Sequence, residues 1–470
     1  MNISIKKIRV IPVLIAGLVF MYGLLAFFVV EALPADHLVT TWKTDNAGTS
    51  SSTSITIPTG SGTFNYQVDW NNDGDFTDVN TYGGGIDEAT LYTGDVTFDF
   101  GSTGTYTIRI QGDFPMIYFN NGGDKLKILD VDQWGSQVWS SFVQSFWGCS
   151  NLEVNATDSP DLSSVTNLDS MFFQATSFNQ DISGWDVSNV TSMLQMFYGA
   201  TSFNQPLNAW GADTALVNNM ANMFSGATSF NQDISGWDVS SVTNMSSMFF
   251  QATSFNQDIS GWDVSSVLTM QGMFGGATAF DQPLNAWGAD TALVDDMKWM
   301  FLNAISFNQD ISGWDVSSVT DMSNMFQGAT VFDQPLNAWG ADTALVDDMN
   351  FMFREAAAFN QDISGWDVSS VASMSNMFSL ATSFDQSLNA WGSDTALVNN
   401  MSNMFSGATS FDQDISSWDV ASVADATSMF NSITLSTANY DSLLIGWNAQ
   451  VLQSTVTFSG GNSTYCAGTS

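Results

Sequence analysis

The sequence predicts an α/β solenoid of about 12 short turns, each with a short strand and a short helical segment, preceded by a small all-β sandwich. Two observations carry this prediction. A Met-Phe pair recurs eleven times between Met171 and Phe430, always at a step of 25 or 27 residues. The segment before these repeats alternates apolar and polar residues with period two, as strands with one buried face do.

Residues 1–35 contain a basic cluster followed by an apolar run from Val10 to Val30. This arrangement is typical of an export signal. The small residues Val30 and Ala32 fit a cleaved signal peptide, whereas the 21 apolar residues are also long enough for an uncleaved membrane anchor. In both cases we expect the rest of the chain to be exported, to the cell surface or the extracellular space.

Residues 36–125 are predicted to form the β-sandwich. Their strand-like runs are residues 54–57, 64–70, 96–100 and 105–110. The runs are rich in β-branched and aromatic residues and are separated by Gly-containing turns. Short strands at this spacing favour two small sheets packed face to face.

The loop that follows residues 64–70 is a candidate calcium site. Its side-chain oxygens come from Asp69, Asn71, Asp73, Asp75 and Asp78. Calcium prefers six to eight oxygen ligands, and calcium loops space them in this way. An EF-hand is excluded because Asn80 stands where the bidentate Glu is required. Two interpretations stay open: bound calcium, the one candidate cofactor, or a hairpin turn rich in Asn, Asp and Gly.

Residues 126–445 are predicted to form the solenoid. In one copy, residues 178–185 read as the strand, and residues 187–200 read as a helical or 3₁₀ segment because apolar residues recur mostly at every third position. A copy this short cannot bury its own apolar face, so neighbours must stack around a shared core. Residues 446–470 are expected to form a C-terminal cap, and whether the chain is complete at Ser470 stays open.

Two copy lengths alternate after Trp262, because the longer copies carry two extra residues behind the Trp. We therefore expect one rim of the solenoid to be ridged at the longer copies. The Met-Phe side should stay regular, since the insertion lies away from it.

Three residue types recur once per copy and form ladders when the copies stack. Eleven Trp run from Trp185 to Trp447, and each Phe that opens a copy is followed by Asn or Asp and then Gln. The Trp ladder could fill the core or form a platform for sugar rings. The amide ladders could bond the neighbouring backbone or grip sugar hydroxyls and cations. We favour packing and backbone bonding for both.

Charge excludes one class of partner. The chain has 9 Lys and Arg against 47 Asp and Glu, and the array contains just Lys298 and Arg354 as cations. A nucleic-acid groove needs several cations to neutralise phosphates, so nucleic acid is not an expected partner.

Catalysis is not predicted either. The chain has one His, His37, and Asp pairs such as Asp181 and Asp186 recur from copy to copy. Catalytic carboxylate pairs are normally single and lie in a cleft. Cys149 and Cys466 flank the array, which should hold them too far apart for an intramolecular disulfide.

The repeat MF-x-x-A-T-S-F-N-Q-D-I-S-G-W-D-V-S-S-V-T-N-M, with residues 126–152 as its entry, resembles the BspA-type leucine-rich-repeat surface proteins of bacteria. The resemblance extends over about residues 37–470 and implies leucine-rich-repeat-like turns behind a PKD- or Ig-like sandwich. It also implies an exported protein that adheres to host proteins, other cells or matrix, without catalytic residues. The chain departs from that family in using Met, Phe and Trp where Leu is usual.

We therefore expect a non-enzymatic surface protein that binds an extracellular protein through its repetitive surface. Two alternatives stay open: a glycan-binding module that uses exposed aromatic or amide ladders, and a passive structural stalk. Contact with the membrane is expected only through residues 1–35, if they are not cleaved.

Overall fold

The computed structural model describes residues 36–79, 82, 85–454 and 456–466. The described residues belong to one compact unit. The predicted export segment lies outside the described residues. In the part of the chain that the structure describes, no helix combines the length and the apolar character needed to cross a membrane.

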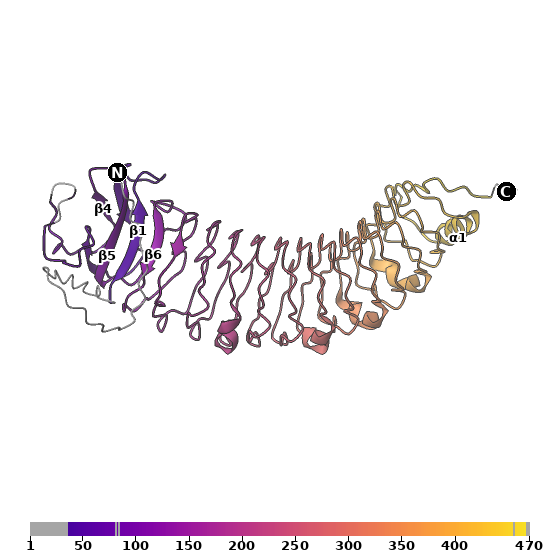
Figure 1. Ribbon diagram of the computed structural model, residues 1–470. Helices are drawn as coiled ribbons and strands as arrows, with labels where there is room; N and C mark the ends of the chain where they lie inside the picture. The colour runs from indigo at the N-terminus through magenta and orange to yellow at the C-terminus, as the bar shows by residue number, and fades with distance from the viewer. Residues whose placement is uncertain (1–35, 80–81, 83–84, 455, 467–470) are drawn as a thin grey trace, which may run out of the picture. The chain divides into compact units, whose positions relative to one another are not determined.

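Two strand layers, antiparallel except for the pair β6–β7, form the N-terminal region (Figure 1). The larger sheet has the order β3-β5-β1-β6-β7, with bounds Asn65–Asp69, Thr105–Asp113, Leu38–Lys43, Ile128–Gln133 and Glu153–Val154. The smaller sheet pairs β2 (Ser54–Ile57) with β4 (Val96–Asp99). Trp70, which follows β3, stacks on Phe98 of β4 at a ring-centroid distance of 4.2 Å, so the aromatic core joins the two sheets. The four predicted runs all contain strands, whereas β1 was not among them.

The larger sheet continues into the repeats. β6 pairs antiparallel with β1 and parallel with β7. The parallel pair β6–β7 begins a series in which each coil lies beside the coil before it (Figure 1).

Each coil of the repeat region forms one parallel bridge to its neighbour on either side. The bridge residues are Asn167, Ser192, Asn219, Asn244, Thr269, Asp296, Asp321, Asp348, Ser373, Asn400 and Asp425. Backbone hydrogen bonds alternate between local turns and the next coil: Met196 donates to Met193 at 3.2 Å, and Phe197 donates to Met223 at 2.9 Å. The repeats are therefore mostly turns.

The predicted secondary structure of a copy was wrong in two respects. Residues 178–185 form no strand, and residues 187–200 form a series of turns with a single bridge at Ser192 instead of a helical segment. At residues 178–185 the backbone bonds are local turns, from Phe178 to Ala175 and from Trp185 to Ile182, so no strand ladder forms. At residues 187–200 the N–H groups alternate between local turns and the next coil, which leaves no i to i−4 bonds.

Helical structure in the repeats occurs in the longer copies. The four 3₁₀ helices are η1 (Asn208–Thr214), η2 (Asn285–Thr291), η3 (Asn337–Leu345) and η4 (Asn389–Leu397). They lie along one side of the coils, which confirms the predicted ridge (Figure 1). The single α-helix among the described residues, α1 (Thr437–Asn448), follows the last coils, and the Ser436 side chain caps it by accepting from Asn439 N–H.

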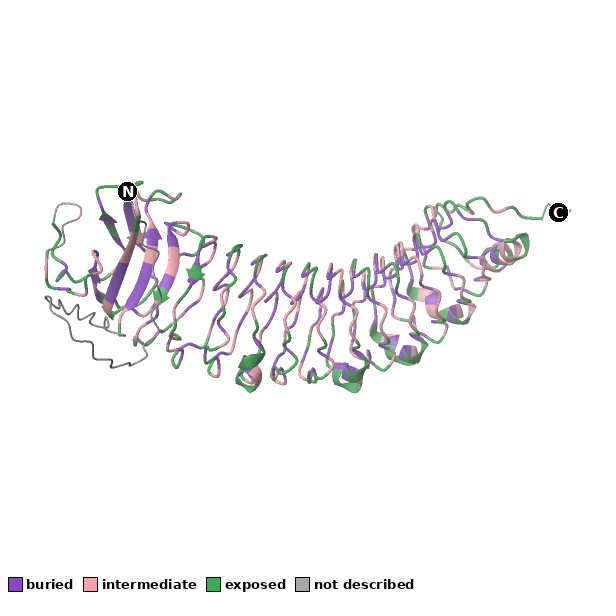
Figure 2. Cartoon of the chain, viewed as in Figure 1, coloured by how far each residue is buried: buried purple, intermediate pink, exposed green. Residues whose placement is uncertain are grey.

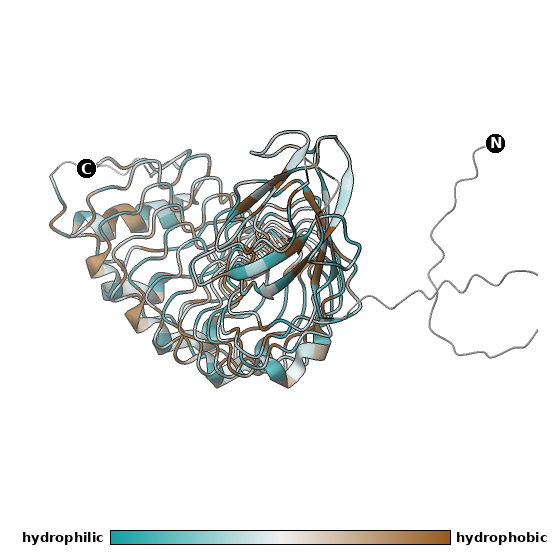
Figure 3. Ribbon diagram, turned by 90° about the vertical axis from the view of Figure 1, so that its left-hand side faces the viewer, coloured by the Kyte–Doolittle hydropathy of each residue, from teal (hydrophilic) through white to brown (hydrophobic). Residues whose placement is uncertain are grey.

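Buried residues recur along the coils (Figure 2), and their side chains form a continuous aromatic and Met core. The Phe of each Met-Phe pair stacks on the equivalent Phe of the next coil, as Phe197 does on Phe224 at 5.5 Å. Within a coil, Phe197 stacks on Phe203 at 4.1 Å. A view rotated by 90° shows the hydropathy of the coils and of the N-terminal sheets (Figure 3).

The Trp ladder belongs to this core, as predicted. All eleven indoles are buried, and the most exposed, Trp447, reaches 8 %. From Trp210 to Trp447 the indole N–H groups of the ladder donate to carbonyl oxygens of the preceding coil, as Trp314 does to Leu284 at 3.0 Å. The ladder therefore offers no platform for a ligand.

The Asn/Asp and Gln ladders bond neighbouring coils, which confirms the structural interpretation. Asn256 Oδ1 accepts the backbone N–H of Asp281 at 2.9 Å and the side-chain amide of Gln282 at 2.9 Å. The same pattern repeats along the array and ends where Asp412 accepts from Ser436 N–H at 2.7 Å.

Candidate functional site

The predicted calcium loop connects β3 to the smaller sheet, and its side chains are used in turns. Asn71, Asp73 and Asp75 each accept, through Oδ1, the backbone N–H of the residue two positions later, at 2.8 to 3.0 Å. Asp73 and Asp75 are exposed. Hydrogen bonds from Thr77 lower the pKa of Asp75. These contacts are those of an Asn- and Asp-rich turn.

Asp69 and Asp78 lie deeper than the other predicted ligands. Asp69 is fully buried, accepts from Gly74 N–H at 2.8 Å, and has Arg109 Nε 3.9 Å from its Oδ2. Burial raises the pKa of Asp69. Asp78 is half-buried and accepts, through its backbone carbonyl, the N–H of Glu88 at 3.1 Å.

Glu88 is the residue of this region that sequence reasoning missed. It is 1 % exposed, and its Oε1 accepts the N–H of Trp70 at 2.9 Å. Burial, followed by repulsion from Asp69 and the contact with Asp78, raises the pKa of Glu88 to about 8. No spacing rule links Glu88 to the loop, because the return of the chain past Asp78 brings it there.

The calcium interpretation stays a prediction. Among residues 36–79, 82, 85–454 and 456–466, no group of three or more His, Cys, Asp or Glu side chains is arranged to hold a metal ion. The Oδ1 of Asn72 is buried without a hydrogen-bond partner among these residues.

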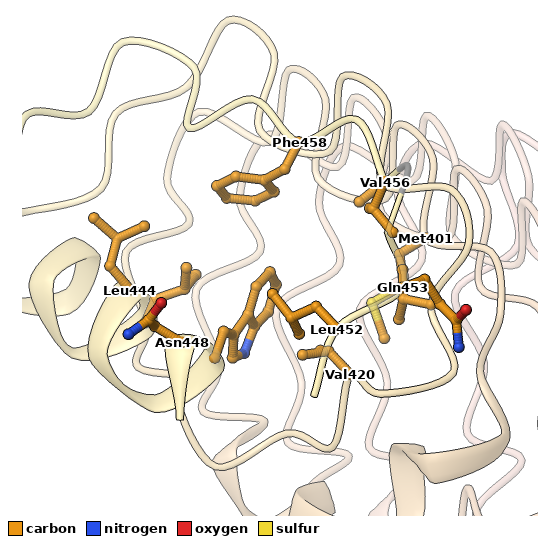
Figure 4. A pocket seen from close by; sticks show the side chains of 12 residues that line it. Met401, Val420, Leu444, Asn448, Leu452, Gln453, Val456 and Phe458 are labelled. Atoms are coloured by element: carbon orange, nitrogen blue, oxygen red, sulfur yellow. The ribbon is translucent and has the colours of Figure 1, made fainter. Parts of the chain in front are cut away.

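A cavity of about 270 Å³ lies between α1, the last coils and the segment after α1 (Figure 4). Its walls are mainly apolar and include Val420, Leu444, Trp447, Leu452 and Phe458. Two side-chain amides, those of Asn448 and Gln453, also line it.

The repeated Asp side chains accept hydrogen bonds within turns, and the two Cys side chains form no disulfide. Asp181 and Asp186 each accept the N–H of the Ser two residues later, at 2.9 and 3.0 Å, and the bonds from Ser188 lower the pKa of Asp186. Cys149 is buried and Cys466 is exposed, and both are free thiols. Burial raises the pKa of the Cys149 thiol well above its ordinary value.

One side of the coils varies more than the interior. We call it the bridged face: the bridge residues and the mostly half-buried side chains that follow them, up to the residue after each Met-Phe pair. That last position is occupied by Tyr198, Ser225, Phe250, Leu302 and Arg354 in different coils. These side chains do not follow the repeat, so they are not required by it.

Comparison with known proteins found one family. A family model described as "Mycoplasma protein of unknown function, DUF285" matches residues 116–213, 211–293, 289–344 and 340–443. No curated protein and no solved structure matches the chain. The matched region covers the repeats and begins within the N-terminal region.

Proposed function

The chain belongs to the DUF285 family of Mycoplasma proteins of unknown function, and from this premise we propose a non-enzymatic surface protein that binds an extracellular protein through the exposed faces of its coils. Export would depend on residues 1–35, with cleavage or anchoring as the two routes. The bound partner would lie outside the cell.

We also propose that the repeats form a leucine-rich-repeat-like solenoid of about 12 turns, of the BspA kind. Parallel bridges between successive coils support this architecture. So do the inter-coil bonds of the Asn/Asp ladder and the Phe stacks, which join each coil to its neighbours on both sides.

The observation that carries the proposal is the contrast between a uniform interior and a varied exterior. The Met, Phe, Trp and Asn/Asp ladders make contacts inside the array, so they act as a scaffold. The bridged face carries different side chains in successive coils. Exposed positions that vary over a fixed scaffold are the arrangement of repeat proteins that bind partners along an extended surface.

The Trp ladder and the Asn/Asp ladder, which the glycan-binding alternative requires, make contacts inside the array. The indoles of the Trp ladder are buried, and the Asn/Asp oxygens are used by the next coil. A passive stalk remains the competing function, since a stalk also needs a regular interior.

The proposal is tested with bacteria that express the full chain. Proteinase K is preferred over trypsin for probing exposure, because the chain has just nine Lys and Arg. We expect cleavage in intact cells and retention of these cells on immobilised extracellular proteins, but not on a glycan array. Protection from the protease would contradict export. Exposed protein without retention on any protein surface would favour the passive stalk.

A further inference from the structure

Because the copies repeat, the residue at a given position of the bridged face can be compared with the residues at the same position in the other coils. One position, which immediately precedes the Met of each Met-Phe pair and Ser145 of the entry coil, has a positive φ of 54° to 63° throughout the array. Its occupants are Gln144, Ser170, Gln195, Asn222, Ser247, Gly272, Trp299, Asn324, Phe351, Asn376, Asn403 and Ser428. Ten of these twelve are Gly or short polar side chains and amides, whereas two are aromatic.

Trp299 and Phe351 therefore depart from the pattern of their own array. Both have φ of 59°, a conformation that bulky side chains rarely adopt. Trp299 is 38 % exposed, so core packing does not account for an indole there. In the preceding coil the equivalent residue is Gly272, which adds no side chain beside the indole. Large exposed aromatics of this kind are frequent anchors of protein interfaces.

Trp299 lies beside a cation of the chain, and this cation also lies beside a carboxylate of the next coil. Lys298 Nζ lies 5.0 Å from the centroid of the Trp299 ring and 3.6 Å from Asp321 Oδ2. Asp321 is bridged to Asp296 in the preceding coil and to Asp348 in the next. We call Asp296, Lys298, Trp299, Asp321, Asp348 and Phe351 the Trp299 patch. It holds three carboxylates and one cation, so its net charge is negative.

The nearby cation Arg354 does not reverse this charge. Its Nη2 lies 2.9 Å from Glu355 Oε1, and its guanidinium carbon lies 5.8 Å from the Phe351 ring centroid. The pair is therefore neutral as a unit. Each aromatic of the patch has a cation of the chain beside its ring, in the arrangement of a cation–π contact.

The carboxylates of the patch would be stabilised by a further cation. Burial, followed by repulsion from neighbouring Asp residues, raises the pKa of both Asp296 and Asp348. Asp321 contributes to this repulsion on both of them. A positive group placed over the bridge ladder would offset the repulsion.

We propose that the Trp299 patch is the partner-binding centre of the array and that it takes a basic segment of a protein, with Arg or Lys side chains over Trp299 and beside Asp321. Charge complementarity selects this occupant, because the chain carries a net charge of −38 and an acidic segment would be repelled. The inference rests on the proposed function and assigns that function to a particular part of the bridged face.

The test uses the purified full chain and fluorescence anisotropy of labelled peptides at low salt. The probes are an (Arg-Gly)₄ peptide, an (Glu-Gly)₄ peptide and a (Gln-Gly)₄ peptide. We expect binding of the Arg peptide alone, weakened about three- to fivefold by Trp299→Asn and by Asp321→Asn. Asn is tolerated at both positions elsewhere in the array, as Asn324 and Asn400 show, so both variants should fold.

Two further variants separate the patch from general attraction to an acidic protein. Asp425→Asn removes the same charge from the same ladder outside the patch and should change the affinity less than twofold. Lys298→Gln removes the competing internal cation and should strengthen binding of the Arg peptide two- to fivefold. Equal losses for Asp321→Asn and Asp425→Asn, weaker binding for Lys298→Gln, or preference for the Glu peptide would overturn the proposal.

Retention of cells that express these variants tests the patch assignment separately from the proposed function. If wild-type cells are retained on extracellular proteins and Trp299→Asn cells are retained equally well, the patch assignment fails and the proposed function stands. If wild-type cells are not retained at all, the proposed function fails whatever the peptides do.

Discussion

Asn204 Oδ1 accepts the backbone N–H of Asn231, 27 residues later, at 2.9 Å. The same oxygen accepts the side-chain amide of Gln232 at 2.9 Å. One side-chain atom thus satisfies two donors of the next coil, and the pattern continues along the array. Burying the ends of short turns without such acceptors would leave costly unpaired N–H groups.

Replacing one rung of this ladder should destabilise the array. Asn256→Ala leaves the N–H of Asp281 and the amide of Gln282 without their acceptor. We expect the free energy of unfolding to fall by about 2 kcal/mol, measured by urea denaturation of the full chain. Asn256→Asp is the control and should stay within about 0.5 kcal/mol of wild type, because Asp281 itself serves the next coil. Equal effects of Ala and Asp would contradict the ladder.

A buried Trp should respond differently from an exposed one. Trp314 is 2 % exposed and donates to Leu284 O at 3.0 Å. We expect Trp314→Ala to lower the free energy of unfolding by about 3–5 kcal/mol. Trp299→Ala, at an exposed indole, should change it by less than about 1 kcal/mol. The result that would contradict this account is a similar loss for both variants in the same denaturation experiment.

The N-terminal sheets should become less stable as the pH rises. Because the pKa of Glu88 is raised to about 8 from an ordinary 4.5, the folded state holds its proton more firmly than the unfolded state between these values. This contribution is therefore complete below the ordinary value and is lost as the pH approaches 8, at a slope of at most about 1.4 kcal/mol per pH unit.

Substitution of Glu88 checks the origin of that slope. Glu88→Gln should flatten the dependence of unfolding on pH between 5 and 8, followed by urea denaturation at each pH, while Asp69, Asp78 and Arg109 remain in place. Glu153→Gln changes an exposed carboxyl of β7 and should leave the slope as it is in wild type. An unchanged slope in Glu88→Gln would show that another group titrates.

Calcium binding by the loop at Asp73 is tested by isothermal titration of the full chain, first stripped with EDTA. If the loop is a site, calcium should bind with one-to-one stoichiometry and raise the melting temperature. Asp78→Asn should then weaken binding, whereas Asp181→Asn in a repeat turn should not. Absence of any heat or thermal shift at millimolar calcium would leave the turn as the loop's sole role.

The sequence predicted the structure best at positions where a recurring residue type has a single structural role. The period of the Met-Phe pairs predicts stacked copies, and the burial of Trp314 and the bonds of Asn256 follow from that stacking. The predicted strand at residues 178–185 failed because the backbone there bonds in local turns, and the predicted helical segment at residues 187–200 failed because every second donor pairs with the next coil. A single-sequence pattern reports which side chains are buried and does not reveal which distant carbonyl each N–H group reaches.

The candidate sites were less predictable for the same reason. Glu88 reaches the calcium loop through the path of a long connection, which no spacing rule describes. Trp299 and Phe351 stand out only after the structure shows that their position has a positive φ in every copy. From the sequence alone, these two residues cannot be distinguished from the many other aromatics of the array.

The central claim is that each copy is an interchangeable unit whose stability comes from its neighbours. It is tested most directly by deleting residues 314–365 from the full chain, which removes one short and one long copy and joins Gly313 to Trp366 in phase. Thermal unfolding should remain cooperative with a midpoint near that of wild type. Deleting residues 314–352 breaks the phase and should abolish this transition. If both deletions unfold alike, or both are tolerated alike, the claim is contradicted.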